Sequence, residues 1–217
     1  QDCTAATRAY VHASQIDAFI DGVADLFNSV VVGDPTDPAT DLGPLVSLRQ
    51  QQRVAGFVDR ARAGGARIVC GGQSPQGDLA KGAYYLPTLV TGVAQQAEIV
   101  QQEVFGPVLV VLPFNTDDEA IALANDTGYG LAASAWSKDV FRTLRAQREI
   151  KAGTVWINDH IPIMSEMPHG GFNQSGFGKD MSTYSFDEYT QIKHVCLDIT
   201  GEAHKEWHRT VFTIDAS

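Results

Sequence analysis

Apolar residues recur with a helical period in two long segments of the chain. Between residues 14 and 30 they occupy one helical face, and the buried set is expected to be Ile16, Phe19, Ile20, Val23, Leu26 and Phe27. Ser14 followed by Asp17 predicts the cap of this helix, which ends before the Gly-Asp-Pro turn at 33–35. A second helix is predicted from about residue 47 to residue 63, where a Gly-Gly pair follows. Its buried residues are expected to be Val54, Phe57, Val58 and Ala61.

Short apolar runs between the helical segments predict strands. They lie at residues 9–13, 66–70, 84–90, 107–114, 131–136 and 153–158. One helix follows Thr116, with Glu119 completing a capping box, and another over 139–150 points Val140, Phe141 and Leu144 inward. Strands joined by helices require crossover connections, so the pattern predicts an α/β fold with a mostly parallel sheet.

The periodicity stops at residue 160. Residues 160–183 are rich in Gly, Pro, Ser and Asn, and a loop of this length inside a compact domain is typical of a functional segment. Ser185 and Glu188 predict the cap of a short helix, and residues 192–199 alternate as a strand does.

Composition and charge narrow the class of protein. The 217 residues are 44% hydrophobic, enough for one large domain with a substantial core. The net charge of −10 disfavours a nucleic-acid partner, and no apolar run is long enough to cross a bilayer. Three cysteines without a C-x-x-C pair disfavour a disulfide framework or a zinc site and favour the reducing cytoplasm. The first residue is not Met, so the chain is expected to be part of a longer protein.

Local chemistry alone leaves Cys3 open to two interpretations. A thiol third from the start is an ordinary group at a frayed end unless something orders it, whereas a positioned thiolate is a nucleophile. Trp156, His160 and His169 do not form a metal-binding set. The glycines of HGG and SGFG are expected to permit tight turns, because no phosphate-binding loop surrounds them.

Six ordered blocks of the chain resemble the NAD(P)-dependent aldehyde dehydrogenase superfamily. They are GDP at 33, GPLVS at 43, EVFGPVL at 103, AND-x-GYGLAASAW at 124, GTVWIN at 153 and SGFGKD at 175. The resemblance runs from residue 1 to about residue 200, and the segment 165–190 is most similar to the aminobutyraldehyde and betaine-aldehyde group. It implies a three-layer catalytic domain over residues 1–186, an oligomerisation strand over 187–200 and a tail over 201–217.

The resemblance also implies roles for individual residues. Cys3 would attack the aldehyde to form a thiohemiacetal and then a thioester, with its own N–H donating to the oxyanion. Glu103 would bind the nicotinamide ribose of NAD, while Phe105 and Leu131 would pack beside the nicotinamide ring. The alternatives are a turn cap for Glu103 and simple core positions for Phe105 and Leu131.

The loop that follows GTVWIN would form a wall of the substrate tunnel. Asp159 and Glu166 would attract the cationic end of an amino- or trimethylammonium-aldehyde, and Ile163 and His169 stand where many relatives place aromatic residues. Exposed carboxylates on loops are more often simply solvated, and this alternative stays open for both acids.

The chain also departs from the family pattern. It has no G-x-G-x-x-G fingerprint, so the dinucleotide-binding domain is expected to be absent, along with the general-base glutamate and the oxyanion asparagine. NAD is therefore expected to bind weakly or not at all to this chain alone. Three functions follow: the catalytic half of an aldehyde dehydrogenase, a cofactor-free thiol esterase or acyl-transfer protein, and a silent oligomerisation module. A homo-oligomer through the C-terminal strand is expected, without nucleic-acid or membrane partners.

Overall fold

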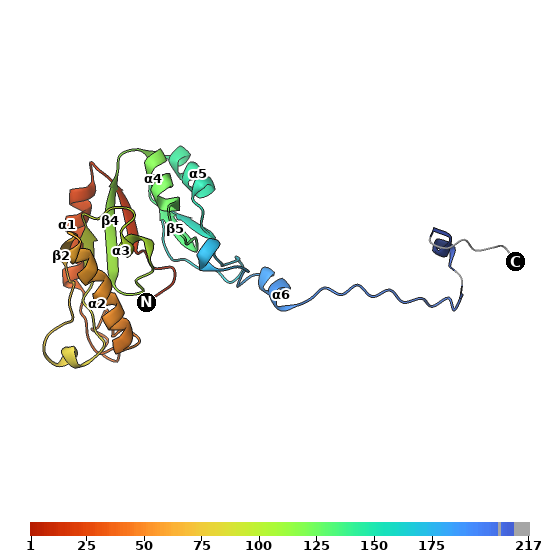
Figure 1. The fold of residues 1–217 in the computed structure, drawn as a ribbon, viewed down its shortest axis with the longest axis horizontal. Coiled ribbons are helices and arrows are strands. Elements are labelled where there is room, and N and C mark those ends of the chain that lie inside the picture. Colours follow the sequence, from red (N-terminus) through yellow and green to blue (C-terminus); the bar gives the residue numbers. More distant parts are fainter. Residues whose placement is uncertain (204, 211–217) are drawn as a thin grey trace.

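A four-stranded sheet forms the centre of the larger part of the molecule. The computed structural model describes residues 1–203 and 205–210 (Figure 1). The strand order is β1-β4-β3-β2, with β1 at Arg8–His12, β2 at Arg67–Cys70, β3 at Thr88–Thr91 and β4 at Val108–Phe114. The β1–β4 and β3–β4 pairs are parallel and the β2–β3 pair is antiparallel. The predicted α/β class with a mostly parallel sheet is confirmed.

Helices cover both faces of this sheet. On one face lies α1 (Ile16–Ser29), and on the other lie α2 (Leu48–Ala63) and α3 (Glu98–Gln101) (Figure 1). Because successive side chains of a strand point to opposite faces, β4 divides its apolar residues between the two layers. Val110 joins the core beneath α2, whereas Val111 packs with Ile20 of α1. The three-layer arrangement predicted for the catalytic domain is therefore observed around this sheet.

A second, smaller sheet contains two parallel strands, β5 (Ala132–Ala135) and β6 (Thr154–Ile157). The helices α4 (Asp117–Asn125) and α5 (Val140–Glu149) lie beside it (Figure 1). The described part of the chain thus contains two sheets, a division that the sequence pattern did not predict. The remaining elements are η1 (Gly77–Lys81), η2 (Asn173–Ser175), α6 (Tyr184–Tyr189) and η3 (Glu206–Thr210).

Side chains fix the starts of two helices. The Ser47 hydroxyl accepts a hydrogen bond from the Gln50 amide at 3.2 Å, so α2 begins where the sequence predicted. Thr116 accepts from the Glu119 amide at 3.2 Å, and the Glu119 carboxylate accepts from the Asn115 amide at 2.8 Å. The predicted capping box at α4 is confirmed, with its return bond shifted to the residue before the cap.

Two other predicted caps are wrong. Ser14 bonds to Nδ1 of His12 at 2.8 Å, and α1 starts after Gln15 without a side-chain cap. The Ser185 hydroxyl donates to the carbonyl of Ser182 at 3.0 Å, because α6 already begins at Tyr184. In each case a nearer acceptor engages the serine hydroxyl.

Burial also differs from the predicted pattern at several helix positions. The second helix buries Val54, Phe57 and Val58 as expected. On α1 and α5, however, five residues predicted to point inward are exposed: Phe19, Leu26, Val140, Phe141 and Leu144. The strand predicted over 84–90 is shorter, since β3 starts at Thr88, immediately after Pro87, which has no N–H to donate.

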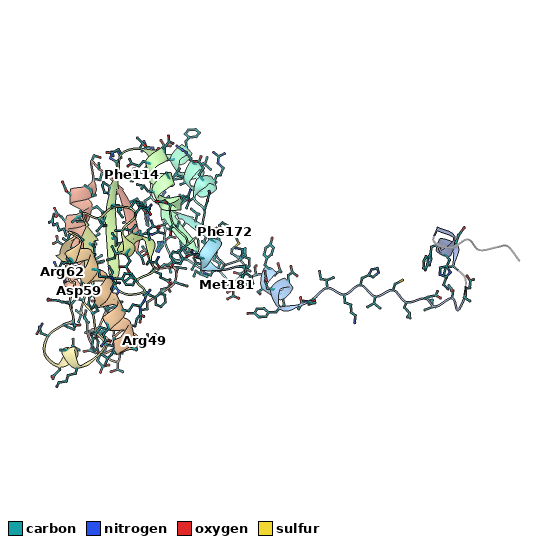
Figure 2. All side chains as sticks on the ribbon, viewed as in Figure 1. Arg49, Asp59, Arg62, Phe114, Phe172 and Met181 are labelled. Atoms are coloured by element: carbon teal, nitrogen blue, oxygen red, sulfur yellow. The ribbon has the colours of Figure 1, made fainter. Side chains whose placement is uncertain are left out.

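Polar contacts at the outer surface of α2 anchor the turn after β2. Figure 2 shows Asp59 and Arg62 side by side on this helix, where Nη1 of Arg62 lies 2.6 Å from Oδ1 of Asp59. Nη2 of Arg62 donates to the carbonyl of Gly72 at 2.9 Å. Gly71 has φ of 70°, and a Cβ there would lie 2.1 Å from the carbonyl oxygen of Pro87. Only glycine fits at this turn.

The C-terminal segment leaves the two sheets and runs outward beyond α6 (Figure 1). Residues 190–199 pair with no strand of the described chain. Its apolar side chains are exposed, namely Ile192, Val195, Leu197 and Ile199. The strand predicted at 192–199 is therefore not formed within a single chain. Val211 and Phe212, two apolar residues of the predicted tail, lie outside the described residues.

Candidate active site

A short turn at the start of the chain holds Cys3. The side-chain carboxylate of Asp2 accepts hydrogen bonds from the Thr4 amide, at 2.7 Å, and from the Thr4 hydroxyl. The Ala5 amide donates to the carbonyl of Asp2 at 3.2 Å. These bonds lower the pKa of the Asp2 carboxyl, with the Thr4 hydroxyl as the largest cause. Thr4 is buried whereas Cys3 is exposed, so an ordered turn presents the thiol to solvent.

The loop from Glu103 to Gly106 is fixed by long polar side chains of α2. Nη2 of Arg53 donates to the Glu103 carbonyl and Nη1 to the Val104 carbonyl, each at 2.6 Å. Nε2 of Gln50 donates to the Phe105 carbonyl at 3.0 Å. Phe105 has φ of 57°, a conformation uncommon for a residue with a side chain. The donors from α2 stabilise this strained loop and set the positions of Glu103 and Phe105.

Gln1 joins the cysteine turn to the same loop. Its Nε2 donates to the Phe105 carbonyl at 3.1 Å, and its Oε1 accepts from the Val46 amide at 2.8 Å. The loop also packs closely on α2, because a Cβ on Gly106 would lie only 2.5 Å from Cγ2 of Val54. Cys3 and Phe105 are therefore held in one locally connected unit.

A cavity of about 280 Å³ opens beside this unit. Four of the residues singled out in the sequence line it together: Cys3, Glu103, Phe105 and Leu131. Arg8 and Lys151 add positive charge to its wall, and Nη1 of Arg8 is buried without a hydrogen-bond partner in the described part of the chain. The structure thus brings together the predicted nucleophile and the predicted cofactor contacts, while their roles stay predictions.

The residues predicted to contact substrate lie elsewhere. None of them lines this cavity among the described residues: Asp159, Ile163, Glu166 and His169. The first three are exposed, and Asp159 accepts a hydrogen bond from the His160 amide at 2.8 Å. His169 exchanges two backbone hydrogen bonds with Asp180, at 2.8 and 2.7 Å. Their contact with a substrate stays a prediction.

The three cysteines differ in environment. Cys70 is partly buried on β2, and burial raises the pKa of its thiol. Cys196 would be buried if the strand predicted at 192–199 packed on a core, but it is exposed in the single chain. Within residues 1–203 and 205–210, no group of three or more His, Cys, Asp or Glu side chains could hold a metal ion. In the same residues, no helix is both long and apolar enough to cross a membrane.

Three residues that shape this site escaped the sequence reasoning. Gln50 and Arg53 are three positions apart on α2, and polar residues at this spacing are typical of a helix face that is exposed to solvent. Both residues lie beside the apolar row of Val54 and Phe57, and this position could have indicated that they face the rest of the domain. His160 contacts the cysteine turn from 156 residues away, and no local pattern marks such a contact.

The lining of the cavity fits one end of a nicotinamide dinucleotide. A carboxylate such as that of Glu103 accepts hydrogen bonds from two ribose hydroxyls, and Phe105 and Leu131 supply apolar surface beside a flat ring. The sequence supplies no glycine-rich loop for the pyrophosphate. The carboxylate and the two apolar side chains therefore suit the nicotinamide ribose end.

Several known proteins are similar to the chain in sequence and in fold. Betaine aldehyde dehydrogenases from Atriplex hortensis (chloroplastic) and Brucella anthropi are each 39% identical to the chain, covering 93% and 92% of it but 40% and 41% of their own lengths. An apo betaine aldehyde dehydrogenase structure from Staphylococcus aureus matches with a TM-score of 0.89 and 38% identity, over 95% of this chain and 41% of that one. An NAD+ complex of aldehyde dehydrogenase from Bacillus cereus matches with a TM-score of 0.88 and 38% identity, over 92% of this chain and 40% of that one. The chain thus spans about two fifths of the length of these relatives. Residues 1–195 match the Aldehyde dehydrogenase family, and the chain belongs to that family.

Proposed function

We propose that the chain is the nucleophile-bearing part of an NAD-dependent aldehyde dehydrogenase that oxidises an aldehyde to the carboxylic acid. The observation that carries the proposal is the shared cavity, which Cys3 lines together with Glu103, Phe105 and Leu131. The NAD+ complexes among the related structures support the cofactor. The names of the relatives support betaine aldehyde, which has a cationic end, and the resemblance of residues 165–190 extends the class to aminobutyraldehydes.

The chemistry begins at the thiol. The Cys3 thiolate attacks the carbonyl carbon, a sulfur–carbon bond forms, and the electron pair of the carbonyl π bond moves to oxygen. The Thr4 amide already donates to Asp2, so we assign the oxyanion to the N–H of Cys3. Glu103 would hold the nicotinamide ribose of NAD, and the bound cofactor would supply the hydride acceptor. Phe105 and Leu131 would exclude water from their side of the nicotinamide ring.

The cationic end of the substrate would be recognised by the loop after β6. Asp159 and Glu166 are exposed carboxylates on this loop, and His160 of the same loop contacts the turn that carries Cys3. Carboxylates attract an ammonium group, and Ile163 and His169 would supply the neighbouring walls. Charge reversal at either acid should weaken binding of a cationic aldehyde more than binding of a neutral one of equal length.

Protection of the thiols by aldehyde tests the proposal in the 217-residue chain. Betaine aldehyde should slow the alkylation of Cys3 by iodoacetamide, because the thiohemiacetal removes the free thiolate. Cys196 is the control, since it lies outside the cavity that Cys3 lines, and the aldehyde should leave its own alkylation rate unchanged. Equal rates at Cys3 with and without aldehyde would contradict the proposal. If in that case Cys3 accepted the acyl group of a p-nitrophenyl ester, the thiol esterase function would replace the proposed aldehyde dehydrogenase function.

We also propose that, within the segment 187–200, the residues that follow α6 add as a strand to a neighbouring copy, followed by the tail at 201–217. Val195, Leu197 and Ile199 alternate along one face and are 72%, 79% and 87% exposed in the single chain. Pairing with another sheet would bury them and satisfy the open backbone groups. Deletion of residues 187–217 should shift sedimentation toward the monomer, and an intact chain that stays monomeric at high concentration would overturn the assignment.

We further propose the cytoplasm as the compartment. All three cysteines are free thiols, and Cys3 must stay reduced to act as a nucleophile. Detection of the protein in an oxidising compartment would contradict this assignment.

A further inference from the structure

The side chain of His160 contacts the turn that carries Cys3, although the two lie 156 residues apart in the sequence. Its Nε2 lies 3.0 Å from the carbonyl oxygen of Thr4, the residue after Cys3. A carbonyl oxygen only accepts hydrogen bonds, so Nε2 carries the proton and donates. Gln1 ties the turn to the Phe105 loop on one side, and His160 ties it to the loop after β6 on the other.

The position of the His160 ring is itself fixed. The indole of Trp156, which is buried at the end of β6, meets the His160 ring edge-on, with ring centroids 5.0 Å apart and planes at 72°. Nε1 of Trp156 donates to the carbonyl of Pro162 at 2.9 Å, and the His160 amide donates to Asp159 at 2.8 Å. The edge-on contact with Trp156 and the hydrogen bond of the His160 amide therefore hold the ring beside Thr4.

The backbone around His160 is strained. Asn158 has φ of 54° and Ile161 has φ of 80°, and this region is rare for a β-branched side chain. The Asn158 side chain accepts from the Ser137 amide at 2.8 Å and donates to the Ser137 carbonyl at 2.9 Å. Strain that the surrounding structure maintains in this way is typical of functional sites.

Burial of the second ring nitrogen of His160 costs free energy, and packing against Trp156 does not explain why this cost is retained. Nδ1 of His160 is buried and has no hydrogen-bond partner among the described residues. A phenylalanine would fill the same space beside Trp156 without leaving an unpaired acceptor. A polar ring at this position is consistent with a requirement for the donor at Nε2.

We propose that His160 is a positioning residue for the nucleophile, which holds the Cys3 turn through the Thr4 carbonyl and couples it to the loop after β6. The inference rests on the proposed role of Cys3. Because the bond is to the backbone of the residue next to Cys3, its loss frees the turn while leaving the thiol itself unchanged. The site then keeps its nucleophile but loses the fixed direction from which sulfur approaches a carbonyl carbon.

Two substitutions separate positioning from space filling. His160→Phe keeps a ring beside Trp156 and removes the donor, whereas His160→Gln removes the ring and keeps an N–H donor at the reach of Nε2. Positioning predicts that the Phe variant is impaired and the Gln variant is largely restored. Space filling predicts the reverse order. His12→Phe is the control, since His12 also meets an aromatic ring, that of Phe114, far from the turn.

The experiment measures two quantities in the 217-residue chain. Hydrogen exchange at the Ala5 amide reports the order of the turn, and it should be about fivefold faster in His160→Phe and within about twofold of wild type in His160→Gln, as expected for loss and retention of one hydrogen bond. The yield of the Cys3 adduct with betaine aldehyde should follow the same order, and long-range ¹H–¹⁵N correlations should show His160 protonated at Nε2.

Three results would overturn the positioning role. They are unchanged Ala5 exchange in His160→Phe, a His160→Gln variant as impaired as His160→Phe, and a ring protonated at Nδ1 alone. Failure of the proposed function looks different. A wild-type chain that forms no aldehyde adduct would remove the chemical role of Cys3, while the exchange rates of Ala5 would still report whether His160 holds the turn.

Discussion

Replacing Gly106 by alanine tests how closely the loop that carries Glu103 and Phe105 packs on α2. A Cβ at this position would lie 2.5 Å from Cγ2, 3.0 Å from Cγ1 and 3.3 Å from Cβ of Val54. Val54 is fully buried and the contacts come from both its methyl groups, so neither rotation nor solvent offers relief. Overpacking of this kind costs about 1–3 kcal/mol.

A double-mutant cycle with Val54→Ala isolates the clash. Val54→Ala alone removes two buried methyl groups and should destabilise the fold by about 2–3 kcal/mol, from lost transfer free energy and the remaining cavity. In the double variant the alanine at 106 fills part of that cavity. The destabilisation of the double variant should therefore be smaller, by about 1–2 kcal/mol, than the sum of the destabilisations of the two single variants.

Urea unfolding of the four chains measures these free energies through the midpoint and slope of each transition. Gly22→Ala is the matched control, because nothing lies within 4 Å of a Cβ at this exposed position of α1. It should stabilise the chain by about 0.5–1 kcal/mol. An unchanged midpoint for Gly106→Ala, or strictly additive effects in the double variant, would refute the packing described here.

Three further predictions concern ionisation, capping and cofactor binding. Burial raises the pKa of Tyr85 to about 12, above its ordinary value of 10.0, so the unfolded chain releases this proton first and stability should fall as the pH rises through that interval. Tyr85→Phe should lose less stability at alkaline pH than the wild type and should be as stable as the wild type at pH 7, since the hydroxyl has no partner in the described residues. If urea unfolding showed the same alkaline fall in stability for both chains, the prediction would be contradicted. Thr116→Ala should cost about 1 kcal/mol by removing the cap of α4, measured by thermal unfolding, whereas no shift would mean that the cap is replaced. The 217-residue chain should bind NAD more weakly than the micromolar range by calorimetry, because Glu103 and Phe105 meet only one end of the dinucleotide, and micromolar affinity would require a further pocket.

Most secondary structure followed from local pattern, and the errors have physical causes. The apolar row of α2 and the Thr116 cap were predictable because their partners lie within one or two helical turns. Phe19 and Phe141 were misassigned because periodicity identifies an apolar face without showing whether another layer covers it. Residues 192–199 show the same limit, since a strand pattern forms a strand only where a partner exists.

The candidate site was predictable through resemblance more than through spacing. Cys3, Glu103, Phe105 and Leu131 come from three separate segments, and only the fold brings them to one cavity. The donors that hold the site were missed because their contacts join residues about fifty to 156 positions apart, as for Arg53 with Glu103 and His160 with Thr4. The positive φ of Ile161 has no sequence signal, because a β-branched residue predicts the opposite backbone.

The most direct test of the central claim is detection of a covalent aldehyde adduct on Cys3. Betaine aldehyde labelled with ¹³C at the carbonyl carbon is added to the 217-residue chain, and the thiohemiacetal carbon is followed by NMR. Wild type and Cys196→Ser should both show the resonance, because the second exposed thiol lies outside the cavity, and Cys3→Ser should not. A resonance that persists in Cys3→Ser, or one that disappears in Cys196→Ser, would contradict the assignment of Cys3 as the nucleophile.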